Sequence, residues 1–393
     1  MRLGDCCKTN LHTYSDKEKW SLIRYLDTGS ITEGRIDEIQ TLYPGVDKIP
    51  SRARRKASVG DILFSTVRPN QKHYGIIEAG TENLLVSTGF TVVTVDTTIA
   101  DPYFIYYYLT QSSVIESLQA IAEQSTSTYP SIKPSDIEDI ELDLPELETQ
   151  KKIGSTLRML DRKIALNEEI NDNLEQQLRS VFMELFSDKI ANVEANNHRP
   201  LGELVINIDN RGKTPPLETT PTEYPIIDVR ALSGTSRIVN YANCTKFVSA
   251  ETYSSWFRSG HPKPKDILVS TVGSLAEIKI FLGSKGCIAQ NVVGFRTKDI
   301  SPYYLYQYLT AIKNDLVAYN IGSVQPSIKV THIIKHPIYI PSTEELETFD
   351  ALAESATNAI YNNTLESERL AGIRDALIPK LMSGEIDLSE VQF

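Results

Sequence analysis

An internal duplication constrains the fold of this 393-residue chain more than any other feature of its sequence. The segment GDILFSTV at 60–67 returns as KDILVSTV at 265–272, and the tetrapeptide PSIK at 130–133 returns at 326–329. The offsets, 205 and 196 residues, are several times the ~20–45 residues of a unit in a stacked repeat array. The sequence therefore predicts two homologous domains rather than one large core or a solenoid.

Each copy follows the same order of predicted elements. Short β-prone runs such as 61–67, broken by Gly, Pro and Asn, come first and are typical of an α+β domain. A short helix with aromatic residues follows, around Tyr103 in the first copy and Tyr303 in the second, and we interpret these rings as core packing rather than as a platform for stacked bases. Each copy closes with a proline, Pro145 or Pro341, and an acidic turn that is typical of a helix start.

Two long helices are predicted after these prolines. Their seam positions recur at alternating steps of four and three, as in a coiled coil, and both seams become polar at Asn167 and Asn363. A buried Asn needs a hydrogen-bonding partner, which antiparallel helices related by a pseudo-two-fold axis would provide. The alternative is that each helix packs on its own domain. The predicted seam residues are Ile153, Leu157, Leu160, Ile164, Asn167, Leu174, Leu178, Phe349, Ile360, Asn363, Leu370 and Leu377.

These patterns divide the chain into four predicted parts. They are a first domain at 1–145, a first long helix at 146–190, a second domain at 191–341, and a second long helix with a C-terminal tail at 342–393. A helix of ~40 residues is about 60 Å long, so the pair would act as a spacer between the domains. Such an arrangement suits a ligand of the same symmetry, for example duplex DNA with two half-sites.

The formal net charge of −11 argues at first against a nucleic-acid partner, because phosphate binding relies on Lys and Arg. The charge is unevenly distributed, however. Residues 1–145 carry a net charge of −6, whereas residues 191–341 carry +5. Within the acidic first domain, four cations also stand together at 52–56, and such a run is either a solvated surface or a phosphate contact.

Candidate DNA-binding residues follow from side-chain chemistry, since Arg suits guanine and Asn or Gln suits adenine. Asn70, Gln71 and Gln325 are therefore candidate base readers, with ordinary loop polarity as the alternative. The Ser and Lys of both PSIK copies fit a shared positioning role, with turn chemistry beside the proline as the alternative. The full set is Arg52, Arg54, Arg55, Lys56, Arg68, Asn70, Gln71, Lys72, Ser131, Lys133, Arg211, Lys213, Thr214, Gln325, Ser327 and Lys329.

Two patterns could point to chemistry, and we interpret both as structural. The segment RGKT at 211–214 resembles the end of a phosphate-binding loop, but Asn207 stands where that motif requires Gly. Asp266, Glu277 and Lys279 have the residue types of a metal-dependent nuclease, yet the Asp merely repeats one of the first copy and the Glu-x-Lys part has no counterpart there. No catalytic residue is predicted.

The cysteines and the hydropathy pattern argue against a metal site, a disulfide framework and a membrane span. The four cysteines form no CxxC pair and no ligand pattern with the histidines, so neither a metal site nor a disulfide framework is predicted. No apolar run approaches the ~20 residues of a membrane span, and the first residues lack the apolar core of a signal peptide. We expect a soluble, cytoplasmic protein without membrane contact.

A family resemblance rests mainly on the helices and on short segments of the second copy. Its residues are Pro145, Gln150, Ile153, Leu157, the run LDRKI at 160–164, Asn167, Leu174 and Glu175, with RGKTP at 211–215, GSVQPSIK at 322–329 and LIPKLMSGEI at 377–386. With two domains and two matched helices, the chain resembles the DNA specificity subunit of type I restriction-modification systems. The second helix departs from the first, with Leu346 in place of Gln150 and with Arg374 on the seam.

The resemblance implies an α+β protein in which two homologous α/β target-recognition domains are separated by two long antiparallel coiled-coil helices with pseudo-two-fold symmetry. Each domain would read one half of a bipartite double-stranded DNA target. The helices would set the gap and dock two methyltransferase subunits, and restriction/translocase subunits would join that core. It implies no chemistry and no cofactor in this chain, so S-adenosylmethionine, ATP and Mg²⁺ would belong to partner subunits.

Two other functions stay open on the sequence alone. One is a self-contained restriction or modification enzyme that carries its own chemistry. The other is an assembly or antirestriction protein that uses only the coiled coil.

Overall fold

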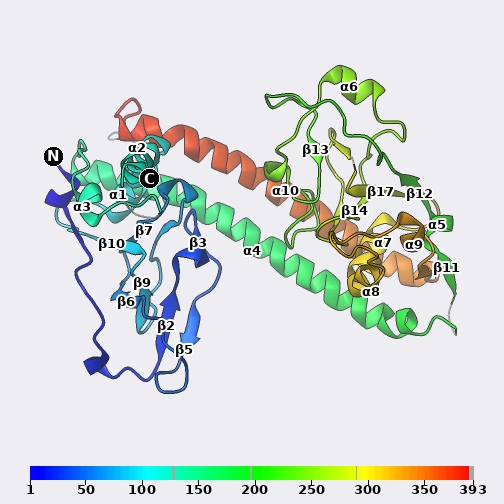
Figure 1. Ribbon diagram of the computed structural model, residues 1–393, viewed down its shortest axis with the longest axis horizontal. Coiled ribbons are helices and arrows are strands. Elements are labelled where there is room, and N and C mark those ends of the chain that lie inside the picture. Colours follow the sequence, from blue (N-terminus) through cyan, green and yellow to red (C-terminus); the bar gives the residue numbers. More distant parts are fainter. Residues whose placement is uncertain (126–128, 195–196, 289, 389–393) are drawn as a thin grey trace. The chain divides into compact units, whose positions relative to one another are not determined.

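The computed structural model describes residues 1–125, 129–194, 197–288 and 290–388, and it consists of two compact units. Unit 1 comprises Met1–Ile164 and Glu368–Phe393, and unit 2 comprises Ala165–Ser367. Each unit therefore contains one of the two domains together with a segment of both long helices (Figure 1). Within the described residues, no helix is long and apolar enough to cross a membrane.

The domain of unit 1 contains two four-stranded sheets and a short hairpin. The first sheet, of order β1-β10-β7-β8, is antiparallel throughout, whereas β2 and β9 of the second sheet run parallel. The strands are β1 (Cys7–Thr9), β10 (Phe90–Val95), β7 (Ile62–Ser65) and β8 (Tyr74–Ile76), then β5 (Gln40–Leu42), β2 (Ile23–Leu26), β9 (Leu84–Ser87) and β6 (Ala53–Lys56), with the hairpin β3 (Ile31–Thr32) and β4 (Arg35–Ile36).

The domain of unit 2 has one four-stranded antiparallel sheet, of order β12-β17-β14-β15, and two two-stranded sheets. The larger sheet is built from β12 (Val205–Ile208), β17 (Val292–Thr297), β14 (Ile267–Ser270) and β15 (Ile278–Ile280). The smaller sheets pair β13 (Ile226–Ile227) with β16 (Cys287–Ile288), and β11 (His198–Pro200) with β18 (Pro337–Tyr339).

The four-stranded sheets β1-β10-β7-β8 and β12-β17-β14-β15 confirm the predicted duplication. Both have the same strand order and the same antiparallel pairing. The central strands β7 and β14 derive from the repeated DIL segment, and all four residues of each are buried, as expected for a strand covered on both faces. The domains differ in their remaining strands. Among the described residues, unit 1 has the four-stranded sheet β5-β2-β9-β6, whereas unit 2 has the two-stranded parallel pair β13-β16.

Short helices pack against these sheets and begin in the same way in both copies. Helix α1 starts with Pro102 after Asp101, whose carboxylate accepts from the Phe104 N–H, and α7 starts with Pro302 after Ser301, whose hydroxyl caps the first turn. The bounds are α1 (Pro102–Leu109), α2 (Ser112–Glu123), α3 (Pro134–Glu138), α5 (Leu201–Leu204), α6 (Ala250–Ser255), α7 (Pro302–Ala311), α8 (Lys313–Ala318) and α9 (Val330–Ile333). Single 3-10 turns are η1 (Leu3–Asp5), η2 (Asp16–Glu18), η3 (Thr28–Ser30), η4 (Pro69–Gln71) and η5 (Tyr241–Asn243).

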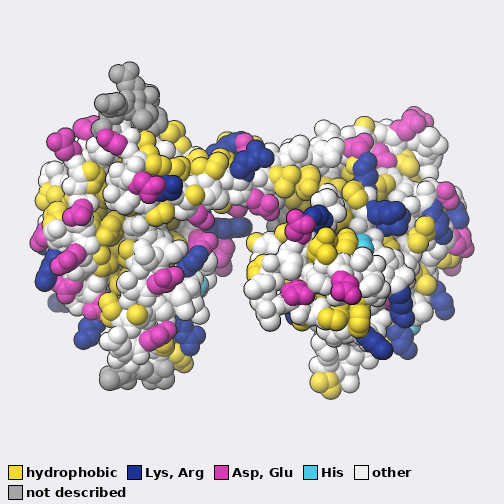
Figure 2. Space-filling view, turned by 90° about the horizontal axis from the view of Figure 1, so that it is seen from above, with side chains coloured by type: hydrophobic (Ala, Val, Ile, Leu, Met, Phe, Trp, Pro, Cys, Tyr) yellow, Lys and Arg dark blue, Asp and Glu magenta, His cyan; other side chains and the backbone are white. Residues whose placement is uncertain are grey.

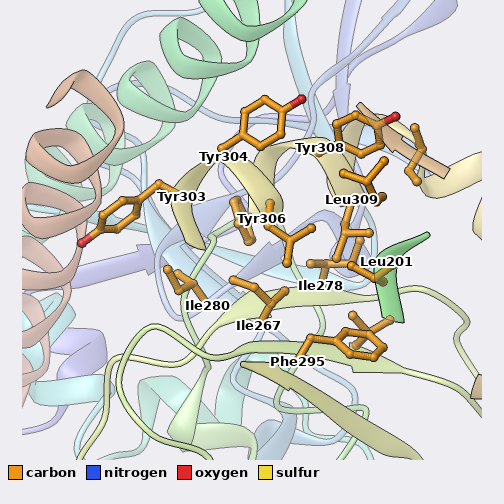
Figure 3. Close-up of a cluster of buried hydrophobic side chains, with 14 of the residues drawn as sticks. Leu201, Ile267, Ile278, Ile280, Phe295, Tyr303, Tyr304, Tyr306, Tyr308 and Leu309 are labelled. Carbon is orange, nitrogen blue, oxygen red and sulfur yellow. The ribbon is translucent and has the colours of Figure 1, made fainter. Parts of the chain in front are cut away.

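The aromatic residues of α1 and α7 lie mainly in the core, which confirms the predicted packing role. Tyr106 and Tyr107 of α1 and Tyr303, Tyr304 and Tyr308 of α7 are buried, whereas Tyr103 is half-buried. In Figure 3, Tyr304 and Tyr308 extend to one side of α7 and Tyr306 extends to the other, toward the sheet residues Ile267 and Ile280. Helix α7 thus lies between the sheet on one side and Phe182 on the other.

The long helices α4 (Leu147–Ala191) and α10 (Thr343–Met382) are antiparallel in each unit. In unit 1, Leu157 from the first part of α4 shares a core cluster with Leu381 from the end of α10. In unit 2, Phe186 near the end of α4 packs on Phe349 near the start of α10, with ring centroids 6.0 Å apart. The alternative that each helix packs on its own domain alone is wrong.

The polar residues at the middle of the seam meet one another, as predicted. The Asn167 side-chain amide is fully buried and donates to the Asn363 carbonyl at 3.3 Å and to the Ser367 hydroxyl at 3.2 Å. The Asn363 amide in turn donates to Asn171 Oδ1 at 2.9 Å. These bonds satisfy polar groups that would otherwise be costly to bury between two helices.

The seam differs from the prediction toward its ends. Phe182 and Phe186 of α4 and Ile378 of α10 are buried, although the predicted four-three spacing ran through neighbouring positions. A straight α-helix has 3.6 residues per turn and drifts by about 20° per heptad from a 3.5-residue repeat. The buried stripe therefore moves off the predicted phase, and Phe182 packs both on Phe349 of α10, at 5.5 Å between ring centroids, and on Tyr304 of the domain, at 5.6 Å. Of the predicted seam, Ile153, Leu157, Asn167, Leu178, Phe349 and Ile360 are buried, and Leu160, Ile164, Leu174, Asn363, Leu370 and Leu377 are half-buried.

Candidate nucleic-acid interface

The repeated PSIK segment has the same backbone role in both domains. In unit 1, the Arg68 N–H donates to the Pro130 carbonyl at 3.0 Å, and the Ile132 N–H donates to the Thr66 carbonyl at 2.9 Å. These bonds attach the segment to the turn that follows β7. Ser131 also forms an isolated antiparallel bridge with the same turn.

Unit 2 repeats this pattern nearly bond for bond. The Gly273 N–H donates to the Pro326 carbonyl at 3.0 Å, and the Ile328 N–H donates to the Thr271 carbonyl at 2.8 Å. Ser327 forms the matching bridge with the turn after β14. The repeated backbone bonds favour the turn-chemistry interpretation for the two serines.

Lys133 and Lys329 stand at the ends of these segments and precede the short helices α3 and α9. Both side chains are exposed, so they remain candidate phosphate contacts. Gln325 is exposed next to Val324, whose side chain is 97% exposed. The loop that carries them thus presents both a polar and an apolar side chain to solvent.

The cations of the basic run 52–56 point in different directions, because the pairing of β6 with β9 is irregular between Ala53 and Arg55. Arg55 points inward, where its guanidinium donates to Asn10 Oδ1 at 2.5 Å and to the Phe90 carbonyl. Burial lowers the pKa of this guanidinium. Arg55 therefore has a structural role that the run of cations concealed.

Arg54 and Lys56 lie on the other face of β6, beside aromatic residues. Lys56 Nζ lies 5.2 Å from the centre of the Trp20 ring and pairs with Glu18. Arg54 lines a hollow of about 420 Å³ together with Tyr14 and Trp20, whose ring centroids are 4.7 Å apart. Arg52 precedes the strand and is exposed. Tyr14 is buried and Trp20 is half-buried, so these rings support the cations rather than offer an open surface for stacked bases.

A second group of candidates occupies the 3-10 turn η4. Arg68 and Lys72 flank this turn with φ angles of 48° and 57°, the left-handed region that non-glycine residues seldom adopt. The Asn70 and Gln71 side chains between them are exposed, as base readers would have to be. The Arg68 guanidinium lies 5.4 Å from the Tyr129 ring centre, and Lys72 pairs with Glu33.

In unit 2, the candidates near residue 211 form a local polar cluster. Arg211 donates to both carboxylate oxygens of Asp209, at 2.9 and 2.6 Å. Burial alone would raise the pKa of Asp209, but the hydrogen bonds from Arg211 hold it below its usual value. Thr214 accepts from the Gln290 amide at 2.6 Å, while the Lys213 side chain is exposed. The sequence did not point to Gln290.

The positive charge of residues 191–341 is spread over the surface rather than gathered in one patch. On the face that Figure 2 displays, Lys and Arg side chains of unit 2 stand among Asp and Glu side chains. Phosphate contacts by unit 2 would therefore depend on individual cations.

The three residue types of the nuclease-like pattern are engaged separately. Asp266 pairs with Arg296 at 2.7 Å, and Glu277 pairs with Lys313 at 3.0 Å. Lys279 donates to backbone carbonyls, and its burial lowers its pKa to about 8. Cys6, Cys7, Cys244 and Cys287 are buried free thiols, and the described residues contain no group of His, Cys, Asp and Glu side chains that could hold a metal ion.

Arg237 is a buried charge that the sequence did not predict. Arg237 is 1% exposed and contacts Glu175 of α4 and Thr357 of α10. It stands alone in its segment, without neighbouring cations or a repeated partner in the first copy. Only the opposing carboxylate, which lies 62 residues earlier in the chain, reveals its role.

Comparison with known proteins decides the family. The family model described as "Type I restriction modification DNA specificity domain" matches residues 49–176 and 195–351, which together make up most of the chain. The chain belongs to this family. One match covers the first domain from residue 49 onward and most of α4, and the other covers the second domain and the start of α10.

Relatives of this specificity-subunit family extend over nearly the whole chain. The type I restriction enzyme HindI specificity subunit of Haemophilus influenzae is 24% identical, with 98% of each chain covered. The MjaIX specificity subunit of Methanocaldococcus jannaschii is 23% identical over 84% of this chain and 79% of its own. The crystal structure of the type I restriction-modification system S subunit from M. genitalium shares the fold, with a TM-score of 0.57, 16% identity, and 97% and 95% of the two chains covered.

Proposed function

We propose that this type I specificity subunit reads a bipartite duplex DNA target and that each of its domains recognises one half. The observation that carries the proposal is the doubled family match on two domains with the same β-sheet core. A duplicated reader suits a target with two separate half-sites. Because the outer strands and surface loops of the two domains differ, the two halves of the target are expected to differ in sequence.

The reading surface is proposed to lie on the variable parts of each domain. In unit 1, these are Arg54 and Lys56 beside Trp20, together with the exposed side chains of the η4 turn. In unit 2, they are Lys213 and its neighbours. Arg and Lys would hold the backbone phosphates, while Asn and Gln side chains read base edges in the major groove.

The long helices are proposed to dock two methyltransferase subunits. Apolar side chains stay exposed along α4 in unit 2, where Leu166 is 49% and Ile170 is 38% exposed. Their spacing of four residues places them on one face of the helix. Restriction/translocase subunits would complete the assembly. S-adenosylmethionine, ATP and Mg²⁺ are proposed to be held by these partners, with no chemistry in this chain.

Selection from a pool of random duplexes tests the proposal. The chain is purified with its methyltransferase subunits, and the bound DNA is sequenced. Two short specified blocks separated by a fixed, unspecified gap are expected. A single block, or no enrichment, would contradict recognition by two domains. The competing function, a self-contained enzyme, predicts methylation or cleavage of plasmid by this chain alone with methyl donor and Mg²⁺.

The role of the β6 face is tested by Arg54→Ala. Loss of one phosphate contact should weaken binding to all duplexes alike and lower the slope of log affinity against log salt by about 1. Arg199→Ala is the matched control, because Arg199 pairs with Glu203 four residues away and lies outside the proposed surface. An unchanged salt slope for Arg54→Ala would exclude a phosphate contact there.

A further inference from the structure

Arg237 joins the second domain to both long helices within unit 2. Its Nε and Nη2 donate to the two oxygens of Glu175 on α4, at 2.9 and 2.8 Å, and its Nη1 donates to Thr357 Oγ1 on α10 at 2.7 Å. The guanidinium also lies 5.0 Å from the centre of the Tyr306 ring on α7. One side chain of a domain loop therefore contacts three helices, two of which form the helix pair.

The ion pair between Arg237 and Glu175 is bidentate and lies away from solvent, unlike a typical surface ion pair. Two parallel bonds between guanidinium and carboxylate define an orientation as well as a distance. The backbone N–H of Arg237 donates to the same Glu175 carboxylate at 2.9 Å, so the loop itself is held as well as the side chain. Arg237 is 1% and the Glu175 side chain 18% exposed, which limits competition from water.

The loop that carries Arg237 is also held from the sheet side. Lys279 of β15 is 2% exposed and donates to the carbonyls of Gly234 and Ser236, and the Ile280 N–H donates to the Arg237 carbonyl at 2.7 Å. The sheet, the loop and the helix pair are thereby connected through consecutive hydrogen bonds.

Buried ion pairs seldom add net stability, because desolvation offsets much of the attraction between the charges. Apolar contacts such as Phe182 on Tyr304 already attach the domain to α4. The bidentate ion pair adds a fixed orientation. Two surfaces in hydrophobic contact can slide or tilt on one another, whereas such a movement at a bidentate pair breaks its hydrogen bonds.

We propose that Arg237 is a positioning residue that fixes the orientation of the second domain on α4 and α10, and thereby sets which gap between DNA half-sites the chain accepts. This inference rests on the proposed function. One base pair changes the separation of two half-sites by about 3.4 Å and by roughly a tenth of a helical turn. A domain that is held rigidly rejects such a change, whereas a domain that can tilt tolerates it.

The test measures binding of the full chain, with its methyltransferase subunits, to duplexes whose gap is the selected length or one base pair shorter or longer. Wild type is expected to prefer the selected gap by about tenfold or more, the ratio that ~1.4 kcal/mol provides. Arg237→Ala should keep the half-site sequences but reduce this preference to about threefold or less. Arg237→Lys should restore charge but not the bidentate pair, and therefore should give an intermediate ratio.

A second variant covers the case in which Arg237→Ala does not fold. The double variant Arg237→Met with Glu175→Met removes both charges and keeps apolar bulk, an exchange that buried ion pairs often tolerate. It should lose the gap preference while hydrogen exchange in β14 and β17 stays slow and exchange at residues 233–238 becomes faster. Arg199→Ala should behave as wild type.

The outcomes separate this inference from the function on which it rests. An unchanged gap preference in both the single and the double variant overturns the positioning role and leaves bipartite recognition intact. Wild-type chain that shows no gap preference overturns the proposed function itself, and the inference with it. Loss of gap preference with intact half-site preference supports both.

Discussion

A guanidinium group lies at the contact between domain and helices in both units, but it belongs to the domain in unit 2 and to a long helix in unit 1. In unit 2, Arg237 comes from a domain loop and meets Glu175 and Thr357 on the helices. In unit 1, the guanidinium is Arg374 of α10, which donates to Asp161 of α4 at 2.6 Å. There the domain contributes a neutral group, the Tyr107 hydroxyl, which donates to the same carboxylate at 2.5 Å.

The residues at this contact can be compared directly between the two units, because the duplication relates their positions. Tyr107 matches Gln307, and Asp161 matches Thr357, by the offsets of 200 and 196 residues that relate the two copies. In unit 1, a cavity of about 500 Å³ lies at this place, lined by Glu33, Asp161 and Arg374 among others. In unit 2, Arg237 lies among the corresponding residues and is almost fully buried. Duplication thus preserved the sheets and helices but not the charged contact between them.

Arg237→Ala should change the difference in unfolding free energy between the two units more than any other substitution considered. It removes the guanidinium from the half-buried Glu175 carboxylate and leaves only the backbone N–H of residue 237 as a donor, which is expected to cost about 3 kcal/mol of the unfolding free energy of unit 2. The two tryptophans, Trp20 in unit 1 and Trp256 in unit 2, allow each unit to be followed by fluorescence after the other is replaced by Phe. Denaturant unfolding should show a large shift with Trp256 as the probe and little with Trp20. Equal shifts at both probes would show that the contact is not local to unit 2.

Lys279 predicts a pH dependence confined to unit 2. Burial lowers its pKa to about 8, so between pH 8 and 10.5 the unfolded chain binds more protons than the native chain. The unfolding free energy should therefore rise with pH in this window, by about 1.6 kcal/mol between pH 8 and 9.5, relative to Lys279→Met. Trp256 fluorescence in urea at several pH values measures the difference. A constant difference between the two proteins would exclude the lowered pKa.

Arg374→Ala should cost unit 1 less than Arg237→Ala costs unit 2. The side chains of Arg374 and Asp161 are 25% and 32% exposed, and Tyr107 continues to donate to the carboxylate after the substitution. A loss of about 1–2 kcal/mol is expected, followed with Trp20 as the probe. Asp375→Ala is the control, since that carboxylate is 64% exposed and should contribute little to unit 1. A cost as large as that of Arg237→Ala would remove the difference between the units.

Glu33→Gln should have the smallest effect. Glu33 belongs to the turn between β3 and β4, at the edge of the unit 1 cavity, and pairs with Lys72 through side chains that are half exposed. Exposed pairs of this kind contribute about 0–1 kcal/mol. Thermal unfolding followed with Trp20 should be nearly unchanged. A large loss would mean that a charged loop also fastens the first domain, as Arg237 does the second.

Much of the fold was predictable, because duplication and periodicity leave direct marks in a sequence. The DIL and PSIK segments indicated two copies, and the structure builds the same sheet from each. The polar seam residues Asn167 and Asn363 indicated a paired, antiparallel helix, since buried amides need partners. The ends of the seam were mispredicted at Phe182 and Phe186, where a straight helix drifts out of a heptad register.

The candidate site was less predictable, because it depends on side-chain direction and burial. In the run at 52–56, four cations look alike in sequence, but Arg55 points into the domain, whereas Arg54 stands at an irregularity in the pairing of β6 with β9 and lines the hollow beside Trp20. Arg237 gave no signal, because a single arginine in a loop matches no motif. Its importance depends on burial and on a carboxylate supplied by a different element.

The sequence by itself determined the duplicated architecture, the antiparallel helix pair and the family resemblance, because all three depend on patterns that recur along the chain. Only the tertiary structure decided which charges face solvent and which fasten a domain to the helices. Glu175, Arg237 and Thr357 are separated by 62 and 120 residues and meet on one guanidinium. An ion pair is specified by position in space and by loss of water, and neither quantity is written in the local sequence.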